Sequence, residues 1–461
     1  MSLANPAAHL RGHVLALAAL AVAAPVTALA QAPAPTPPPP IFARDEKDFE
    51  GLTSLALGSG ARAFGMGGAF LARADDATAA SWNPAGLSYL RRPELSVVAA
   101  RNASARGPAG DFPDDTFEGY TPDFMAAAYP IEFGAVSGAA QVSYQRVFSF
   151  GGERLILETA PSRVFTSSTE GGFDLIAVGT GLRVSRSIRL GATVNRWFRG
   201  YSQRKFRSFV PRGRQATWQD IEYSLQGWNV NLGVIWSPVE SLNLGVVGKT
   251  PFTGDVALRR DRRDDFSGTL DPLGVTENEY TVDDVRLDFP GALGLGASWR
   301  PRSALTLSAD YTRTFWSDGR IRNFFVLQPT EPGKDPPVPV PYPALPYPTL
   351  DDFEDGRPRQ FDTAQFRFGV EYVVLGARVK VPLRAGVFTD RQYFADADGQ
   401  PPVFVGFSLG TGLILGPVLF DVAYVREQNT YLDPDGAAGR GTSVTSVFQR
   451  VFVSLIYRHG S

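Results

Sequence analysis

Apolar and polar residues alternate along most of the chain after about residue 92, with the period of two that is typical of β-strands. The clearest segment runs from Trp228 to Trp236: every second residue is apolar, with a tryptophan at each end. Its other face carries Asn229 and Asn231. At a rise of ~3.3 Å per residue the segment is ~26 Å long. A tilt of ~40° leaves a height of ~20 Å, close to the apolar band of an outer-membrane strand between its aromatic girdles. This segment is therefore predicted to cross a membrane as a two-faced strand.

Fourteen segments show this pattern, and the links between them alternate between short and long. The segments are centred near residues 97, 128, 141, 178, 194, 230, 247, 293, 308, 368, 383, 409, 422 and 452. Short links are predicted at 132–134, 185–187, 237–240, 300–303, 375–377 and 415–417, and long links around 103–123, 149–170, 200–220, 255–280, 315–360, 390–402 and 427–445. Short periplasmic turns and long outer loops are what an up-and-down barrel requires. The fold predicted is an all-β, 14-stranded antiparallel transmembrane β-barrel. A secreted β-sandwich is the alternative, with shorter strands and no need for aromatic ends.

The N-terminus has the features of a cleaved signal peptide over residues 1–30. Arg11 precedes an apolar run over residues 14–26, and Ala28–Ala30 gives an A-x-A cleavage pattern. No later run reaches the ~18 consecutive apolar residues of a membrane-spanning helix. Residues 31–40 are rich in proline and are expected to form an extended spacer. The protein is therefore predicted to be exported.

Composition and charge exclude several classes of function. Lys+Arg is 45 and Asp+Glu is 47, so the net charge of −2 argues against a nucleic-acid partner. The chain has no cysteine, and two of its three histidines, His9 and His13, lie in the predicted signal peptide. A Ser-His-Asp triad or a multi-histidine zinc site is thus not expected. We expect no enzyme activity, no catalytic residues, no metal and no cofactor.

A different kind of segment, residues 41–92, precedes the predicted barrel of residues 93–458. It is rich in glycine between residues 58 and 68, which allows close approach of backbones. Asp75 or Asp76 is expected to cap a short helix over residues 77–82, which Asn83-Pro84 would end. Such a segment suits a hatch, or plug, folded into the lumen of a wide barrel.

The run Asn83, Pro84, Ala85 and Gly86 resembles the hatch motif of the FadL/TodX outer-membrane transport family, which moves long-chain fatty acids and other hydrophobic compounds. Phe289-Pro290 and the segment 305–311 are similar to later strands of that family, and the resemblance covers residues 51–458. It implies fourteen strands, in agreement with the count above. Residues 60–70 with Asp75-Asp76 look closer to PorV-like relatives, which share the barrel but can serve a secretion system.

The resemblance implies passive uptake of a hydrophobic small molecule, by capture at the loops and exit through a hatch-gated lumen or sideways through the wall. In the family the lateral opening lies at a kinked third strand, and Gly134 and Gly138 are candidates for it here. Arg189, Lys380 and Arg384 are expected on the lumen face, either to attract a ligand carboxylate or as ordinary lumen charges. The alternative function is a PorV-like secretion accessory or shuttle, which predicts a stable protein partner.

The expected location is the outer membrane of a Gram-negative cell. Besides the hydrophobic ligand, the expected partners are outer-membrane lipid, lipopolysaccharide and, during biogenesis, the barrel assembly machinery. Tyr457 is interpreted as the aromatic assembly signal, followed by a short tail. The acidic residues 351–355 are expected to be solvated loop charges near the lipopolysaccharide–cation layer, and the proline-rich residues 329–348 are expected to form a surface loop.

Overall fold

The computed structural model describes residues 58–108, 115–134, 136–159, 162–209, 215–265, 275–318, 321–322, 361–376, 379–393, 395–433 and 442–460. The predicted signal peptide, the spacer and the first part of the hatch lie outside the described residues. The same holds for the proline-rich and acidic segments between residues 329 and 355.

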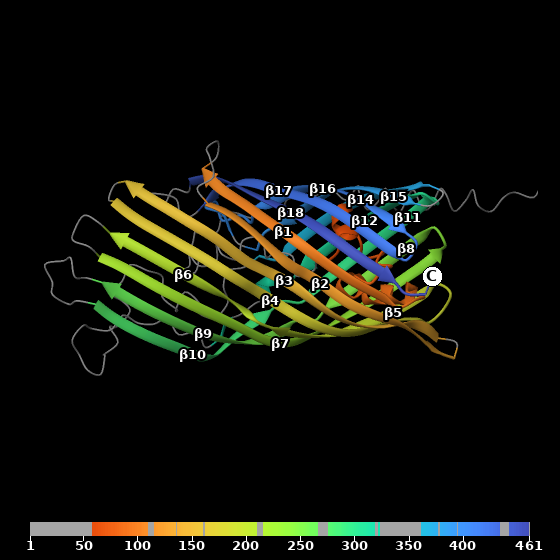
Figure 1. The fold of residues 1–461 in the computed structure, drawn as a ribbon, viewed down its shortest axis with the longest axis horizontal. Helices are drawn as coiled ribbons and strands as arrows, with labels where there is room; N and C mark the ends of the chain where they lie inside the picture. Colours follow the sequence, from red (N-terminus) through yellow and green to blue (C-terminus); the bar gives the residue numbers. More distant parts are fainter. Residues whose placement is uncertain are drawn as a thin grey trace, which may run out of the picture. The chain divides into compact units, whose positions relative to one another are not determined.

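The described strands form one antiparallel sheet that closes on itself (Figure 1). Its strands are β1 (Glu94–Pro108), β2 (Asp115–Phe133), β3 (Val136–Thr159), β4 (Ser162–Arg183), β5 (Ile188–Phe198), β6 (Gly200–Phe209), β7 (Gln215–Val239), β8 (Leu242–Lys249), β9 (Phe252–Asp265), β10 (Val275–Phe289), β11 (Ala292–Arg302), β12 (Leu305–Thr314), β13 (Ile321–Arg322), β14 (Thr363–Leu375), β15 (Lys380–Arg391), β16 (Val403–Leu415), β17 (Val418–Asp433) and β18 (Thr442–Arg458). Pairing of β1 with β18, from Glu94 with Arg458 to Pro108 with Val444, closes the ring.

Four barrel strands are each divided into two segments, namely β5/β6, β8/β9, β10/β11 and β12/β13, so the 18 segments make 18 − 4 = 14 barrel strands. Pro251 and Pro290 lie at two of the divisions, where proline cannot donate to the ladder. Arg199, with φ of 69°, lies at a third, and a 3₁₀ turn (η4, Trp316–Asp318) at the fourth. All fourteen predicted strands are present.

The barrel turns its apolar face outward. On β7, Trp228, Leu232 and Trp236 are 60%, 55% and 48% exposed, whereas Asn229 and Asn231 are buried in the lumen. A soluble β-sandwich would show the opposite arrangement, so this surface is a lipid-facing belt between two aromatic girdles. No helix in the part of the chain that the structure describes is long and apolar enough to cross a membrane.

The outer links differ from the prediction. All six short turns are where the pattern placed them, but most of residues 149–170, 200–220 and 255–280 are strand. β3 has 24 residues and β7 has 25, and β6, β9 and β10 continue beside them at the outer end (Figure 1). Beyond Trp228 the next exposed positions of β7 are polar, including Glu222 and Ser224, and an exposed aromatic residue returns only at Trp218. The strands therefore extend past the lipid belt, where no apolar face marks them in the sequence.

Candidate functional site

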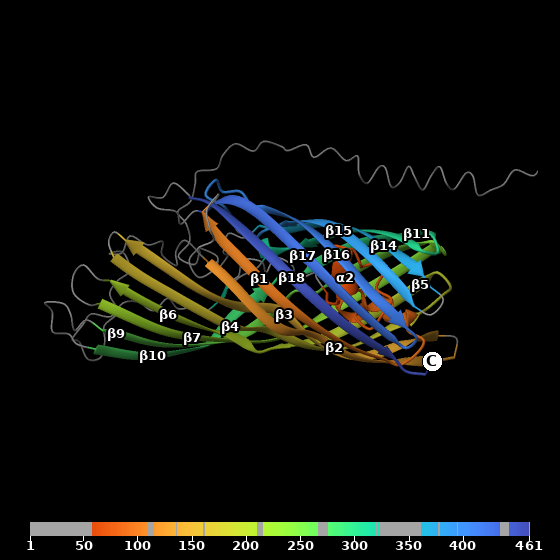
Figure 2. The ribbon, with the colours of Figure 1, turned by 45° about the horizontal axis from the view of Figure 1, so that its top comes forward.

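Residues 58–90 lie inside the barrel as a compact plug, and nearly all of them are buried (Figure 2). The plug contains α2 (Ala61–Gly65), α3 (Ala79–Trp82) and the 3₁₀ helix η3 (Pro84–Tyr89). The helix expected over residues 77–82 begins two residues later. Asp76 does not cap it; its carboxylate accepts hydrogen bonds from the N–H and hydroxyl of Thr78, which shapes the turn before α3.

The predicted hatch motif forms the corner between α3 and η3. The Asn83 amide accepts a hydrogen bond from the N–H of Ala85 at 3.1 Å, which caps η3, and donates to the carbonyl of Leu71 at 2.9 Å. It also reaches the carbonyl of Val234 on β7 at 3.2 Å. Pro84 occupies the first turn of η3, where its missing N–H costs nothing. Gly86 is required because a Cβ there would lie 1.8 Å from the carbonyl oxygen of Ala74. The motif thus fixes the plug internally and against the wall.

The wall receives the plug on a glycine girdle, a set of inward-facing glycines on eight different strands. An added Cβ at each of them would lie within 3.0 Å of a plug atom. The girdle consists of Gly181, Gly191, Gly233, Gly245, Gly296, Gly369, Gly386 and Gly410. At six of these eight glycines the nearest plug atom is a backbone atom, a close approach that only glycine permits.

Buried charges hold the same plug to β14, β15 and β17. Three arginines converge on Glu371 of β14, with N···O distances of 3.3 Å for Arg62, 3.4 Å for Arg73 and 2.8 Å for Arg384. Arg384 of β15 also contacts Asp421 of β17 at 2.6 Å. The two plug arginines are paired further with Asp75 and Asp76 within the plug. Charges buried at this depth are tolerated only when paired, so breaking this network is costly.

Wall side chains also satisfy the backbone of the plug. Asp310 of β12 accepts from the N–H groups of Phe70 and Leu71 at 2.6 and 2.8 Å. Ser408 of β16 accepts from the N–H of Gly67 at 2.8 Å. These contacts replace the water that the plug backbone would otherwise need.

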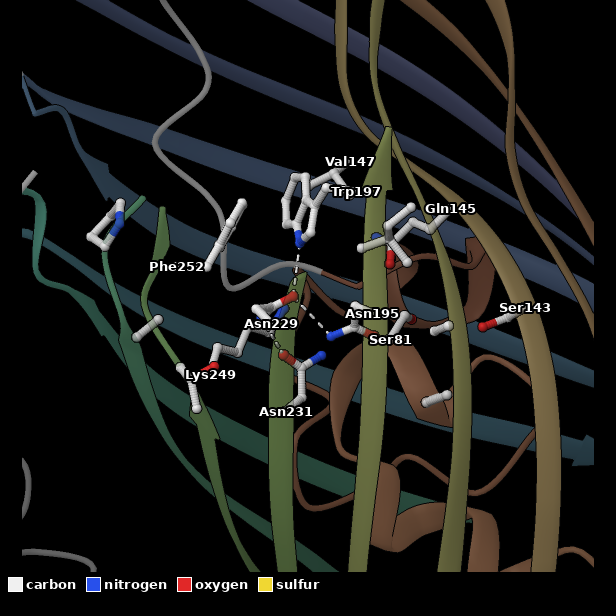
Figure 3. Close-up of a pocket in the computed structure, with 16 residues that line it drawn as sticks. Ser81, Ser143, Gln145, Val147, Asn195, Trp197, Asn229, Asn231, Lys249 and Phe252 are labelled. Atoms are coloured by element: carbon white, nitrogen blue, oxygen red, sulfur yellow. Dashed lines mark hydrogen bonds between the residues drawn. The ribbon is translucent and has the colours of Figure 1, made fainter. Parts of the chain in front are cut away.

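A pocket of about 550 Å³, counting the space at its open mouth, lies on the outer side of the plug (Figure 3). Ala80 and Ser81 of the plug form part of its lining, and Trp197 on β5 lies six residues closer to the outer end than the girdle glycine Gly191. Among the described residues that line the pocket, Lys249 is the only charged one.

Two aromatic residues, Trp197 and Phe252, line the outer part of the pocket and belong to a larger cluster of rings. The rings of Phe252 and Phe289 stack at 4.8 Å, and Trp197 stacks on them at 5.1 and 5.7 Å. Phe148 and Phe173 extend the cluster on β3 and β4. The lower part is polar, with Asn195, Asn229 and Asn231 hydrogen-bonded in a group below Trp197 (Figure 3). The pocket is thus two-sided, which suits a molecule with an apolar body and a polar end.

Asp362, just before β14, fixes the turn that carries Trp316 into the aromatic cluster. Its carboxylate accepts from Arg313 at 2.7 Å and from the N–H and hydroxyl of Ser317 at 3.1 and 2.7 Å. Partial burial on its own would raise the pKa of Asp362, but the hydrogen bonds from Ser317 and Arg313 outweigh it and hold that pKa below its ordinary value.

The ladder between β2 and β3 is interrupted beside the pocket. Pairs run from Phe133 with Val136 up to Phe124 with Gln145, and resume only at Thr116 with Glu153. Residues 117–123 and 146–152 are unpaired with each other, although the register is the same on both sides of the interruption. Gln145 and the adjacent Val147 line the pocket.

The interruption has a local cause. Asp123 is an extra residue in β2 relative to β1, and Val147 is an extra residue in β3 relative to β4. Two bulges at neighbouring positions bend the strands away from each other, and Pro122 cannot donate to a ladder. The Asp123 carboxylate accepts a hydrogen bond from the hydroxyl of Ser59, at the start of the described plug. The wall therefore lacks β2–β3 ladder pairs between the two bulges, next to the pocket and the plug.

The remaining site residues expected from the sequence lie at separate places. Gly134 is in the β2–β3 turn with φ of 59°, and Gly138 is paired with both Ile131 and Leu182, so the interruption lies elsewhere on β3. Arg189 is buried near the inner end of the barrel, with its guanidinium 4.1 Å from the ring centroid of Tyr89.

The three candidate cations do not converge on one site. Lys380 is exposed at the start of β15, and Arg384 is held by Glu371 and Asp421. The cation that does line the pocket, Lys249, was not singled out, because it closes β8 without a pattern that marks it.

No family model and no curated protein matches the sequence. Solved structures do match the fold. A Pseudomonas aeruginosa FadL homologue is 15% identical over 88% of this chain and 99% of its own, with a TM-score of 0.58. The chain has the FadL/TodX barrel fold. The P. putida toluene transporter TodX is 13% identical over 88% of this chain and 100% of its own, with a TM-score of 0.58. The CymD monoaromatic hydrocarbon channel is 13% identical over 88% of this chain and 99% of its own, with a TM-score of 0.56. These likenesses confirm the 14-stranded FadL/TodX fold expected from the sequence.

Proposed function

We propose that this protein is an outer-membrane channel for the passive uptake of hydrophobic small molecules such as long-chain fatty acids. The observation that carries the proposal is that three features adjoin one another: a pocket lined in part by aromatic rings, a plug at its floor and an interrupted β2–β3 ladder at its side. The solved structures with this fold include a toluene transporter and a monoaromatic hydrocarbon channel, which supports an apolar ligand.

The route begins at the outer end, where the extended strands rise past the lipid belt. A ligand captured there meets the rings of Trp197 and Phe252, which line the pocket, stack with Phe289 and offer an apolar surface in the lumen. Burial in this pocket removes the ligand from water without passing it through the polar surface layer of the outer leaflet.

From the pocket we propose that the ligand leaves sideways between β2 and β3 into the bilayer, with the plug remaining seated. The interruption already lacks the ladder bonds that would have to break elsewhere in the wall. An exit downward would require the plug to leave the glycine girdle and the charges around Glu371.

The two bulges provide a direct test. Removing both Asp123 and Val147 brings the outer parts of β2 and β3 into regular register with β1 and β4, and leaves β2 and β3 in register with each other. We expect this double deletion to close the wall while the barrel still folds, which resistance to SDS without boiling would show. Deleting either residue alone shifts β2 against β3 by one residue and serves as the comparison.

Uptake is measured with radiolabelled oleate and toluene in a Gram-negative host that lacks its own fatty-acid channel. The unmodified protein should accelerate uptake of at least one of them, and the double deletion should return uptake to the level of the empty host. Persistent uptake through the closed wall would favour a hatch-gated lumen route. If the unmodified protein carries neither compound and a protein partner co-purifies with it, the secretion-accessory function is favoured instead.

A further inference from the structure

At the polar floor of the pocket, one residue determines which amide atoms donate hydrogen bonds and which accept them. The indole N–H of Trp197 can only donate, and it lies 2.7 Å from the Oδ1 of Asn229. The atom of the Asn229 side chain that faces Trp197 must therefore be oxygen, which removes the usual ambiguity between amide oxygen and nitrogen. The Nδ2 of Asn195 donates to the same oxygen at 3.0 Å.

The orientation of the Asn229 amide in turn determines that of the Asn231 amide. With its oxygen turned to Trp197, Asn229 directs its Nδ2 to the Oδ1 of Asn231 at 3.1 Å. The Nδ2 of Asn231 then points away from Asn229 and has no hydrogen-bond partner among the described residues. Because Asn231 lines the pocket, a hydrogen-bond donor is presented there (Figure 3).

The electrostatics of the pocket agree with that donor. Lys249 lines the same lower part, and no aspartate or glutamate is among the described lining residues. A carboxylate accepts from an amide N–H and is attracted by an ammonium group, whereas an uncharged alcohol gains only the weaker neutral hydrogen bond.

We propose that the chain Trp197–Asn229–Asn231 selects ligands whose polar end is a carboxylate, and that Trp197 is the positioning residue of this selectivity. The inference rests on the proposed function and names the ligand class of the same pocket: an apolar body among the rings and an anionic head at Asn231 and Lys249.

The test compares binding of radiolabelled dodecanoate and 1-dodecanol, which share an apolar chain, to the purified full chain in maltoside micelles. We expect dodecanoate to bind at least about tenfold more tightly, as one hydrogen bond to a charged group implies. Trp197→Phe keeps a ring for stacking but removes the one donor to Asn229 that cannot become an acceptor, so the amides of Asn195 and Asn229 can turn over together. Trp197→Phe and Asn231→Ala should each weaken dodecanoate binding about tenfold and change dodecanol binding by less than about twofold.

The double variant decides whether Trp197 acts through Asn231. We expect it to bind dodecanoate as well as Asn231→Ala does, rather than a further tenfold more weakly. Phe252→Leu is the matched control, because it removes a pocket-lining ring from the stack without removing an amide and should weaken both ligands alike. Equal loss of both ligands in Trp197→Phe, or multiplicative losses in the double variant, would overturn the inference. If the unmodified protein binds neither compound, the proposed function fails as well; if it binds both equally, only the carboxylate selectivity fails.

Discussion

Gly386→Ala tests whether the plug is seated on the wall as the structure shows. Gly386 belongs to the glycine girdle on β15, and a Cβ added there would lie 2.2 Å from the backbone nitrogen of Gly67. Real Cβ contacts essentially never fall below 3.0 Å, so wall and plug must separate by at least 3.0 − 2.2 = 0.8 Å. Neither side can yield by rotating a side chain, because both are backbone.

The cost follows from what the shift disrupts. Overpacking of this kind costs about 1–3 kcal/mol. The N–H of Gly67 also donates to Ser408 at 2.8 Å, and losing that bond adds about 1 kcal/mol. The free energy that holds the plug on the wall near Gly67 should therefore fall by about 2–4 kcal/mol. Because ~1.4 kcal/mol corresponds to a factor of ten, local opening of the plug should become at least about 30-fold more frequent.

Hydrogen exchange of residues 58–70 measures that opening, and single-channel conductance in planar bilayers measures any leak that follows. Gly386→Ala should speed exchange in this segment by about 30-fold or more and raise the conductance. Gly248→Ala is the matched control, because a Cβ at Gly248 on β8 meets nothing within 4 Å. If Gly386→Ala behaves like Gly248→Ala in both assays, the plug does not rest on the girdle and the reasoning fails.

Three further results are expected. Glu371→Gln leaves Arg62, Arg73 and Arg384 without their shared carboxylate, so the free energy that holds the plug on the wall should fall by about 3–5 kcal/mol. The same hydrogen-exchange experiment measures this loss. Unchanged exchange would show that the ion pairs do not hold the plug. Leu232→Arg places a charge in the lipid belt and should lower the folding free energy in lipid vesicles by about 2–4 kcal/mol, whereas Ser224→Arg, above Trp228 on the same face, should have almost no effect. The pKa of Asp362 is lowered in the folded protein, so the ionised carboxylate stabilises the η4 turn at neutral pH. This stabilisation is lost as the pH falls through the lowered pKa, which lies below the ordinary value of about 3.9. Hydrogen exchange at residues 315–318 should become faster at that pH, and Asp362→Asn should show the fast exchange already at pH 7.

The strands were predictable because lipid outside and water inside impose opposite demands on alternate residues. Trp228–Trp236 shows both demands, and its faces are as the alternation indicated. Outside the lipid belt the demand on the outer face disappears. The outer end of β7, residues 215–220, for that reason falls within the long link predicted around residues 200–220. Period-two patterning therefore finds the part of a barrel strand that touches lipid and misses the part that continues above it.

The site was less predictable, because its residues become neighbours only through the closed sheet. Asn83-Pro84 could be found, since a cap and a proline act within a few residues. Asn229 and Asn231 were visible as lumen residues, but Trp197 and Lys249 reach them from other strands. The bulges at Asp123 and Val147 carry no signal of their own, because an extra residue exists only relative to the strand beside it. The girdle glycines occupy inward positions in the strand pattern, but the need for glycine there arises only from contact with the plug, which the strand pattern does not show.

The estimated energies of the two exits favour the sideways route that we propose. Leaving downward requires the plug to break its ion pairs with Glu371, at about 3–5 kcal/mol, and its two backbone hydrogen bonds to Asp310, at about 3–5 kcal/mol together. The sum of about 6–10 kcal/mol corresponds to a slowing of about 10⁴- to 10⁷-fold. Leaving sideways breaks no β2–β3 pair, because the ladder is already absent over residues 117–123 and 146–152. A passive channel has no energy source to move its plug. For the proposed route we therefore infer that the plug stays seated as the floor of the pocket and that the ligand leaves between the two bulges.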